Sequence, residues 1–166
     1  ILGDICYDVL PHIEKYKKEI VRTGIPFYPV VGNHDHDRSA DGGDLEATAA
    51  YRRMLGPENY AFFLGKDVVI ALDNIIYDEN KRYKEGYADH VLAFVKGLAR
   101  FIPASSDIYV VQHSPLRRRR QDTTNEKILN ANDLLSIVHG HKTMFIAGHS
   151  HVFHNHDYNK DVIDQN

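Results

Sequence analysis

The sequence predicts an α/β fold, and three observations lead to this class. Strand-like apolar runs alternate with segments of helical periodicity along the 166 residues. The composition is 43% hydrophobic, which is enough for one globular domain with a buried core. Polar motifs follow the apolar runs, as expected where ligands collect at the carboxyl ends of strands in an open sheet. We therefore expect a single domain over residues 1–166.

Four segments have the periodicity of helices. Apolar residues three or four positions apart predict a helix over 9–22, which a glycine and a proline follow. A second helix is expected over 44–55, with Asp44 as its N-cap and a Gly-Pro pair after its end. Two further helices are predicted over 87–101 and 132–138.

Short apolar runs bounded by turn residues predict the strands. The run 27–31 is interpreted as a buried strand, and a Gly-Lys turn joins 60–64 to 68–73 in a hairpin. Three more strands are expected at 107–112, 143–147 and 152–156.

Composition excludes several classes of protein. The net charge of −3 gives no indication of a nucleic-acid duplex or membrane surface as a partner, and no apolar run approaches the ~20 residues of a membrane span. The single cysteine, Cys6, rules out an internal disulfide and is interpreted as a small buried residue. Because the chain begins at Ile1, inside a strand-like run, we expect it to be a piece of a longer protein. This chain alone does not indicate a cellular compartment.

Four short blocks place Asp, Asn or His beside a glycine or at the end of an apolar run. Together they have the ligand types of a two-metal hydrolytic site, and the eleven histidines of the chain support metal binding. The blocks are Gly3-Asp4-Ile5-Cys6-Tyr7-Asp8, Gly32-Asn33-His34-Asp35, Val110-Val111-Gln112-His113 and Gly148-His149-Ser150-His151.

The residue types in these blocks suit a pair of transition-metal ions. Asp4 has two carboxylate oxygens and can bridge two cations, and Asn33 offers a neutral amide oxygen. His113, His149 and His151 offer imidazole nitrogens, and the last two face the same side in extended backbone, roughly 6.6 Å apart. Mixed nitrogen and oxygen ligands favour Zn, Mn or Fe over Ca or Mg.

His34 directly follows the ligand Asn33, so its side chain is expected near the metals. We interpret it as the general acid for a leaving alkoxide, with Asp35 or Asp8 orienting its ring.

The four blocks closely resemble the motifs GD, GNH[D/E], H and GHxH of the calcineurin-like metallophosphoesterases, from Gly3 to His151. The resemblance implies a four-layer αββα sandwich, here lacking its first strand, and hydrolysis of phosphate mono- or diesters at two metal ions. It assigns Asp4 as the bridging ligand and His151 to the first metal. It assigns the other ligands, Asn33, His113 and His149, to the second metal, and His34 to the phosphate and leaving group.

The chain departs from the family pattern at two places. An earlier Asp-x-His motif on the first strand is expected to precede Ile1, so the first metal lacks ligands here. Where Ser/Thr protein phosphatases have GDxxDRG, this chain has Tyr7, which argues against that activity. The block GDxxY resembles purple acid phosphatases instead, in which the tyrosine binds ferric iron. Tyr7 is therefore either a first-metal ligand or a residue without that role.

Arg117 begins a run of four arginines, which is either a solvated loop or a phosphate contact at Arg117. His36 and His154 lie close to motifs and are candidates for substrate contact. The expected substrate is a phosphorylated small molecule or a glycan- or nucleotide-type ester.

A rival interpretation is a non-catalytic metal-binding or interaction module of a larger protein, because the first ligand motif is absent. An incomplete sheet also exposes unpaired backbone groups, which predicts self-association.

Overall fold

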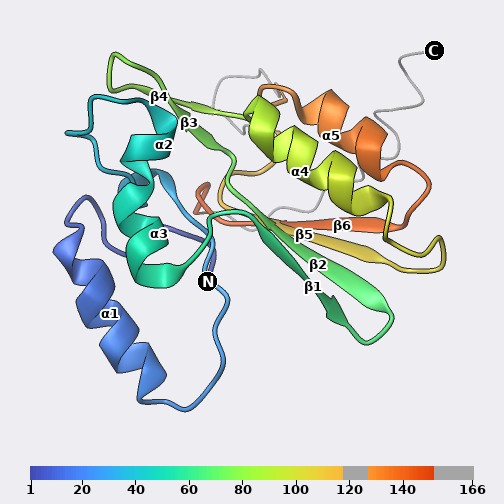
Figure 1. Cartoon of the computed structure of the whole chain (residues 1–166), viewed down its shortest axis with the longest axis horizontal. Helices are drawn as coiled ribbons and strands as arrows, with labels where there is room; N and C mark the ends of the chain where they lie inside the picture. Colours follow the sequence, from blue (N-terminus) through green and yellow to red (C-terminus); the bar gives the residue numbers. More distant parts are fainter. Residues whose placement is uncertain (118–126, 152–166) are drawn as a thin grey trace.

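The computed structural model describes residues 1–117 and 127–151, and these residues form an α/β fold with a mixed sheet. The four-stranded sheet has the order β1-β2-β5-β6 (Figure 1). Strand β1 (Tyr60–Leu64) pairs antiparallel with β2 (Asp67–Leu72), as the predicted hairpin requires. Strands β5 (Ile108–Gln112) and β6 (Thr143–Ala147) continue the sheet in parallel.

Two helices cover one face of this sheet, α4 (Asp89–Ala99) and α5 (Ala131–Val138) (Figure 1). The main core lies between them and the strands, with Val91 and Leu134 packed in one buried cluster with Ile70. Alternate residues of β2 and β5 point into this core because successive side chains of a strand face opposite sides. The helix predicted over 87–101 is therefore confirmed, with shorter bounds.

The remaining helices gather at one side of the sheet (Figure 1). Helix α1 (Pro11–Val21) begins at a proline, which is favoured at the first helical position, and buries Ile13 in a second core cluster. The helix predicted over 44–55 is two helices, α2 (Asp44–Ala47) and α3 (Ala49–Leu55), separated at Thr48. Among the described residues, no helix is long and apolar enough to cross a bilayer.

Two element predictions were wrong. The segment 27–31 is not a strand, although Val30 and Val31 are fully buried. Its apolar side chains reflect burial without ladder pairing, and the backbone N–H of Val30 donates to Ile1 at 2.9 Å instead. Asp44 is not the N-cap, because Gly43 occupies that position and the Asp44 carboxylate accepts the backbone N–H of Tyr77. The strand predicted at 152–156 lies outside the described residues.

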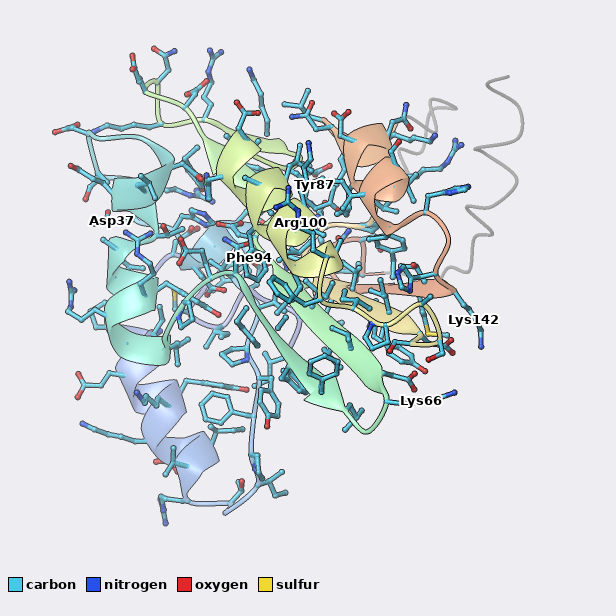
Figure 2. The ribbon with its side chains drawn as sticks, turned by 45° about the vertical axis from the view of Figure 1, so that its right-hand side comes forward. Asp37, Lys66, Tyr87, Phe94, Arg100 and Lys142 are labelled. Carbon is cyan, nitrogen blue, oxygen red and sulfur yellow. The ribbon has the colours of Figure 1, made fainter. Side chains whose placement is uncertain are left out.

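A small second sheet was not predicted from the sequence. Strand β3 (Ile75–Tyr77) pairs antiparallel with β4 (Tyr83–Glu85), directly after β2 in the chain. In Figure 2, Lys66 marks the tip of the β1–β2 hairpin, and Lys142 lies directly before β6. These positions define the amino ends of the parallel strands, so the motifs that follow β5 and β6 lie at the opposite edge.

Candidate metal centre

The register of the parallel strands brings the later motifs together. Leu72 of β2 pairs with Gln112 of β5, which pairs with Ala147 of β6. The strands therefore end level with one another, and His113 and the Gly148-His149 pair emerge at the same edge of the sheet. The backbone N–H of Gly148 donates to the carbonyl oxygen of His113 at 2.9 Å, which ties the two blocks together.

The N-terminal motifs reach this edge through backbone contacts. Asn33 and Asp35 belong to a single 3₁₀ turn, η1 (Asn33–Asp35). The backbone N–H of His34 donates to Oδ1 of Asp4 at 3.0 Å, so the first two blocks lie side by side. Asp4 is thus held beside η1 with its other oxygen free to face the histidines.

Three predicted ligands converge on Nε2 of a fourth, His113. This nitrogen lies 3.0 Å from Oδ1 of Asn33, 3.0 Å from Nδ1 of His149 and 3.4 Å from Oδ2 of Asp4. Asp4, His113 and His149 form a group whose ligand atoms all lie within 4.8 Å of one another. His113 is 1% exposed, whereas Asp4 and His149 are only partly buried.

Each of the two histidine rings, His113 and His149, has one nitrogen in contact with an acceptor outside the group, and this contact determines which nitrogen faces the centre. Nδ1 of His113 lies 2.6 Å from the carbonyl oxygen of Leu2, which can only accept, so Nδ1 carries a proton. Nε2 of His149 lies 3.1 Å from Oε1 of Glu85, and a carboxylate likewise accepts. The neutral rings then present lone pairs at Nε2 of His113 and Nδ1 of His149. In the neutral rings, electron-pair donors therefore face one another, and this donor set fits a transition-metal ion.

Glycines allow this close approach. A Cβ on Gly32 would collide with the backbone N and side chain of Asp4 and lie 3.0 Å from Cε1 of His113. A Cβ on Gly3 would collide with the ring of His113 and lie 2.8 Å from Cα of Gly32. The glycines beside the ligands are therefore needed for space, as well as for the positive φ of 88° at Gly3.

Strained backbone is concentrated in the motif blocks. Five non-glycine residues of the first and last blocks have positive φ: Asp4, Tyr7, Asp8, His149 and His151. Such conformations are uncommon for residues with a Cβ and occur often at functional sites, where surrounding contacts maintain them.

The charges of the centre influence one another. Burial alone would raise the pKa of Asp4, but hydrogen bonds from His113 and the backbone of His34 outweigh it and lower this pKa. Burial would lower the pKa of His113, yet the contacts with Asp4 and Leu2 raise it above its ordinary value. Without an ion, the pair therefore favours a carboxylate beside an imidazolium.

The predicted general acid lies next to this centre. Nδ1 of His34 is 2.9 Å from Oδ2 of Asp8, and Arg38 contacts Oδ1 of the same carboxylate at 3.1 Å. The ring of Tyr7 stacks on the His34 ring with centroids 4.4 Å apart, and Tyr7 is 70% exposed. Arg38 was not predicted from the sequence, because it stands in none of the motif blocks.

Asp35 has a different environment from Asp8. Its carboxylate is fully buried and accepts the backbone N–H groups of Cys6 at 2.9 Å and Gly32 at 3.0 Å. Burial raises the pKa of Asp35. Of the two aspartates expected to orient His34, Asp8 makes the contact, and Asp35 instead stabilises the two motif loops against each other.

Three other predicted site residues lie outside the converging group. His151 is exposed, and Arg117 is half-buried in an isolated backbone bridge with Lys127. His36 is 1% exposed, with a ring stacked on Tyr77, and so has its contacts inside the protein. His154 and the arginines after Arg117 lie outside the described residues.

Glu85 is a site residue that the sequence analysis did not find. It is 8% exposed, follows no motif, and reaches His149 from 64 positions away through the pairing of β3 and β4. Only the tertiary structure places it there.

The chain matches the family described as calcineurin-like phosphoesterase over residues 1–153. It therefore belongs to the calcineurin-like phosphoesterases, a family of metal-dependent phosphoester hydrolases. Among curated proteins, none matches the chain.

Proposed function

We propose that this chain hydrolyses phosphate mono- or diesters at a dinuclear centre of Mn, Fe or Zn ions. The observation that carries the proposal is the convergence of Asp4, Asn33 and His149 on Nε2 of His113. When bound, two such ions supply a hydroxide at neutral pH and stabilise the charge on the phosphoryl oxygens.

Different residues of the chain are assigned to the two ions. Asp4 would hold both ions, because one of its oxygens is oriented by the His34 backbone while the other faces His113. Asn33, His113 and His149 hold the second ion. His151 holds the first ion together with Tyr7, whose phenolate the purple acid phosphatase resemblance assigns to iron.

His34 donates a proton to the leaving group. Its Nδ1 faces Asp8, which orients the ring and leaves Nε2 for the departing alkoxide oxygen. Arg38 on the other oxygen of Asp8 fixes that carboxylate in place. The substrate is a phosphorylated small molecule or a glycan- or nucleotide-type ester, and Arg117 contacts its anionic part.

The test is turnover of p-nitrophenyl phosphate and bis-p-nitrophenyl phosphate by the metal-loaded chain and its His34→Asn variant. We expect turnover to fall by about 10²–10⁴ with the metal content retained. His12→Asn is the matched control, because His12 is exposed on α1. An unchanged rate in His34→Asn would remove His34 from the mechanism.

A second candidate is a non-catalytic metal-binding module. It is favoured by one observation, that Asp4, His113 and His149 form a compact group whereas His151 is exposed outside it. If the chain binds metal but hydrolyses neither ester, the result would support the non-catalytic module and contradict the phosphoesterase.

A further inference from the structure

A second group of potential metal ligands lies apart from the centre described above. His36 follows η1, Asp73 follows β2 and Asp44 begins α2, and their ligand atoms all lie within 4.8 Å of one another. His36 is 1% exposed and Asp73 is 4% exposed. The group shares no residue with the Asp4–His113–His149 centre.

The orientation of His36 leaves one ring nitrogen without a hydrogen bond. Nδ1 lies 2.9 Å from the carbonyl oxygen of Gly32, which can only accept, so Nδ1 carries a proton, and in the neutral ring Nε2 keeps a lone pair. The ring is stacked on Tyr77, with centroids 4.7 Å apart, which restrains its rotation. Within the described part of the chain, no hydrogen-bond partner reaches the buried Nε2. A backbone carbonyl on Nδ1 and a bare Nε2 are the usual arrangement of a metal-binding histidine.

Both carboxylates are oriented by the same short strand. Oδ1 of Asp73 accepts the backbone N–H of Ile75 at 3.0 Å, and Oδ1 of Asp44 accepts that of Tyr77 at 2.9 Å. Each carboxylate keeps a second oxygen. Strand β3 therefore holds two acidic side chains beside a histidine lone pair, in a buried place where uncompensated negative charge is unfavourable.

The distance between His36 and Asp73 is informative. Nε2 lies 3.7 Å from Oδ2 of Asp73, which is too long for a hydrogen bond. Two atoms that each bind one ion at about 2.1 Å, at near-tetrahedral angles, lie roughly 3.4 Å apart. The observed separation is closer to that of two metal ligands than to that of a hydrogen-bonded pair.

We propose that His36, Asp44 and Asp73 bind one divalent transition-metal ion, Zn²⁺ or Mn²⁺, at a structural site separate from the catalytic centre. One nitrogen and two carboxylate oxygens suit these ions, and a divalent charge balances the two carboxylates.

The ion would connect three segments that support the motif loop. His36 lies two positions after His34, and Tyr77, on the strand that orients both carboxylates, donates its hydroxyl to the carbonyl oxygen of Asn33 at 2.9 Å. Binding at this site therefore stabilises η1 and β3 relative to each other.

The experiment uses the full chain with the first centre disabled by Asp4→Asn and His149→Ala. The protein is stripped of metal and dialysed against Zn²⁺, and bound zinc is measured by mass spectrometry together with thermal unfolding. We expect about one ion per chain and a higher unfolding temperature with Zn²⁺. Adding Asp73→Asn should weaken zinc binding at least tenfold and remove the thermal shift.

Two further variants make the result decisive. Asp41→Asn is the matched control, because Asp41 has a 90% exposed side chain and pairs with Lys81 in the same region, and it should bind zinc as the background does. Asp44 is less buried than Asp73. The Asp44→Asn variant therefore tests the proposed zinc site if the Asp73→Asn variant does not fold. Absence of zinc from the folded background, or equal binding in the Asp44 and Asp41 variants, would overturn the proposal and leave a buried His36–Asp73 ion pair. These outcomes are independent of the proposed phosphoesterase activity, since the background lacks that centre.

Discussion

Glu85 and His149 are joined at 3.1 Å between Oε1 and Nε2, and this contact determines which nitrogen of the His149 ring faces Nε2 of His113. Glu85 lies on β4 and is not itself part of the converging group. A carboxylate behind a metal-binding histidine fixes its tautomer and raises its basicity. The small second sheet thus has a role in the centre, because it brings this carboxylate to the end of β6.

Replacing Glu85 by alanine should therefore weaken metal binding by roughly 10- to 100-fold. The measurement is the dissociation constant for Zn²⁺ or Mn²⁺ by calorimetry, with Glu79→Ala as control because Glu79 is exposed in the β3–β4 turn. Equal affinities in the two variants would mean that Glu85 does not orient His149.

Gly32→Ala should disrupt the centre because the added methyl group has no space there. The backbone of Gly32 is extended, with φ −113° and ψ 171°, so alanine is allowed there, but its Cβ would collide with Asp4. We expect a loss of about 1–3 kcal/mol in the free energy of unfolding, together with reduced metal content.

The control for this variant is Gly97→Ala. Gly97 lies within α4, where a Cβ would meet nothing within 4 Å, so this change should stabilise the chain by about 0.5–1 kcal/mol. Chemical denaturation measures both variants, and similar stabilities would show that the space at Gly32 is not required.

Asp8→Asn should lower turnover while leaving the metal content unchanged. The change removes the charge that contacts both His34 and Arg38. Because the ring of His34 remains, the loss should be smaller than the about 10²–10⁴ expected for His34→Asn. Turnover and metal content of the two variants are compared in the same assay, and wild-type turnover in Asp8→Asn would contradict the orienting role.

Cys6 should resist alkylation in the folded protein. Burial raises the pKa of the Cys6 thiol to about 12, and the Asp35 carboxylate nearby contributes to the rise. The thiolate is the reactive form, so at about pH 8 only roughly one thiol in 10⁴ is ionised, and it is 2% exposed. Reactivity rises as the pH approaches the raised pKa and on unfolding. Labelling with iodoacetamide, with and without urea, measures this, and rapid labelling without urea would contradict the described packing.

Hydrophobic periodicity predicted the elements of the main sheet and its covering helices. The hairpin of β1 and β2 followed from two apolar runs around a Gly-Lys turn, and α4 and α5 from their apolar faces. The segment 27–31 was wrongly predicted to be a strand, because its valines are buried without pairing to a strand. Burial and ladder formation leave the same apolar signal in a short run.

Site residues were predictable only where a motif marks them. Asp4, Asn33, His113 and His149 stand in motif blocks, and the structure brings them together. Glu85 and Arg38 lie in no motif, because their roles arise from tertiary contacts that spacing along the chain does not encode.

The most direct test of the central claim is the metal content of the chain purified without chelator, measured by mass spectrometry beside a His113→Ala variant. His113 is the side chain on which Asp4, Asn33 and His149 converge. The proposed dinuclear centre predicts at least one more transition-metal ion per chain in the wild type than in the variant, because His113 is assigned to the second ion. Equal metal content in the two folded proteins would contradict the claim that these residues form a metal centre.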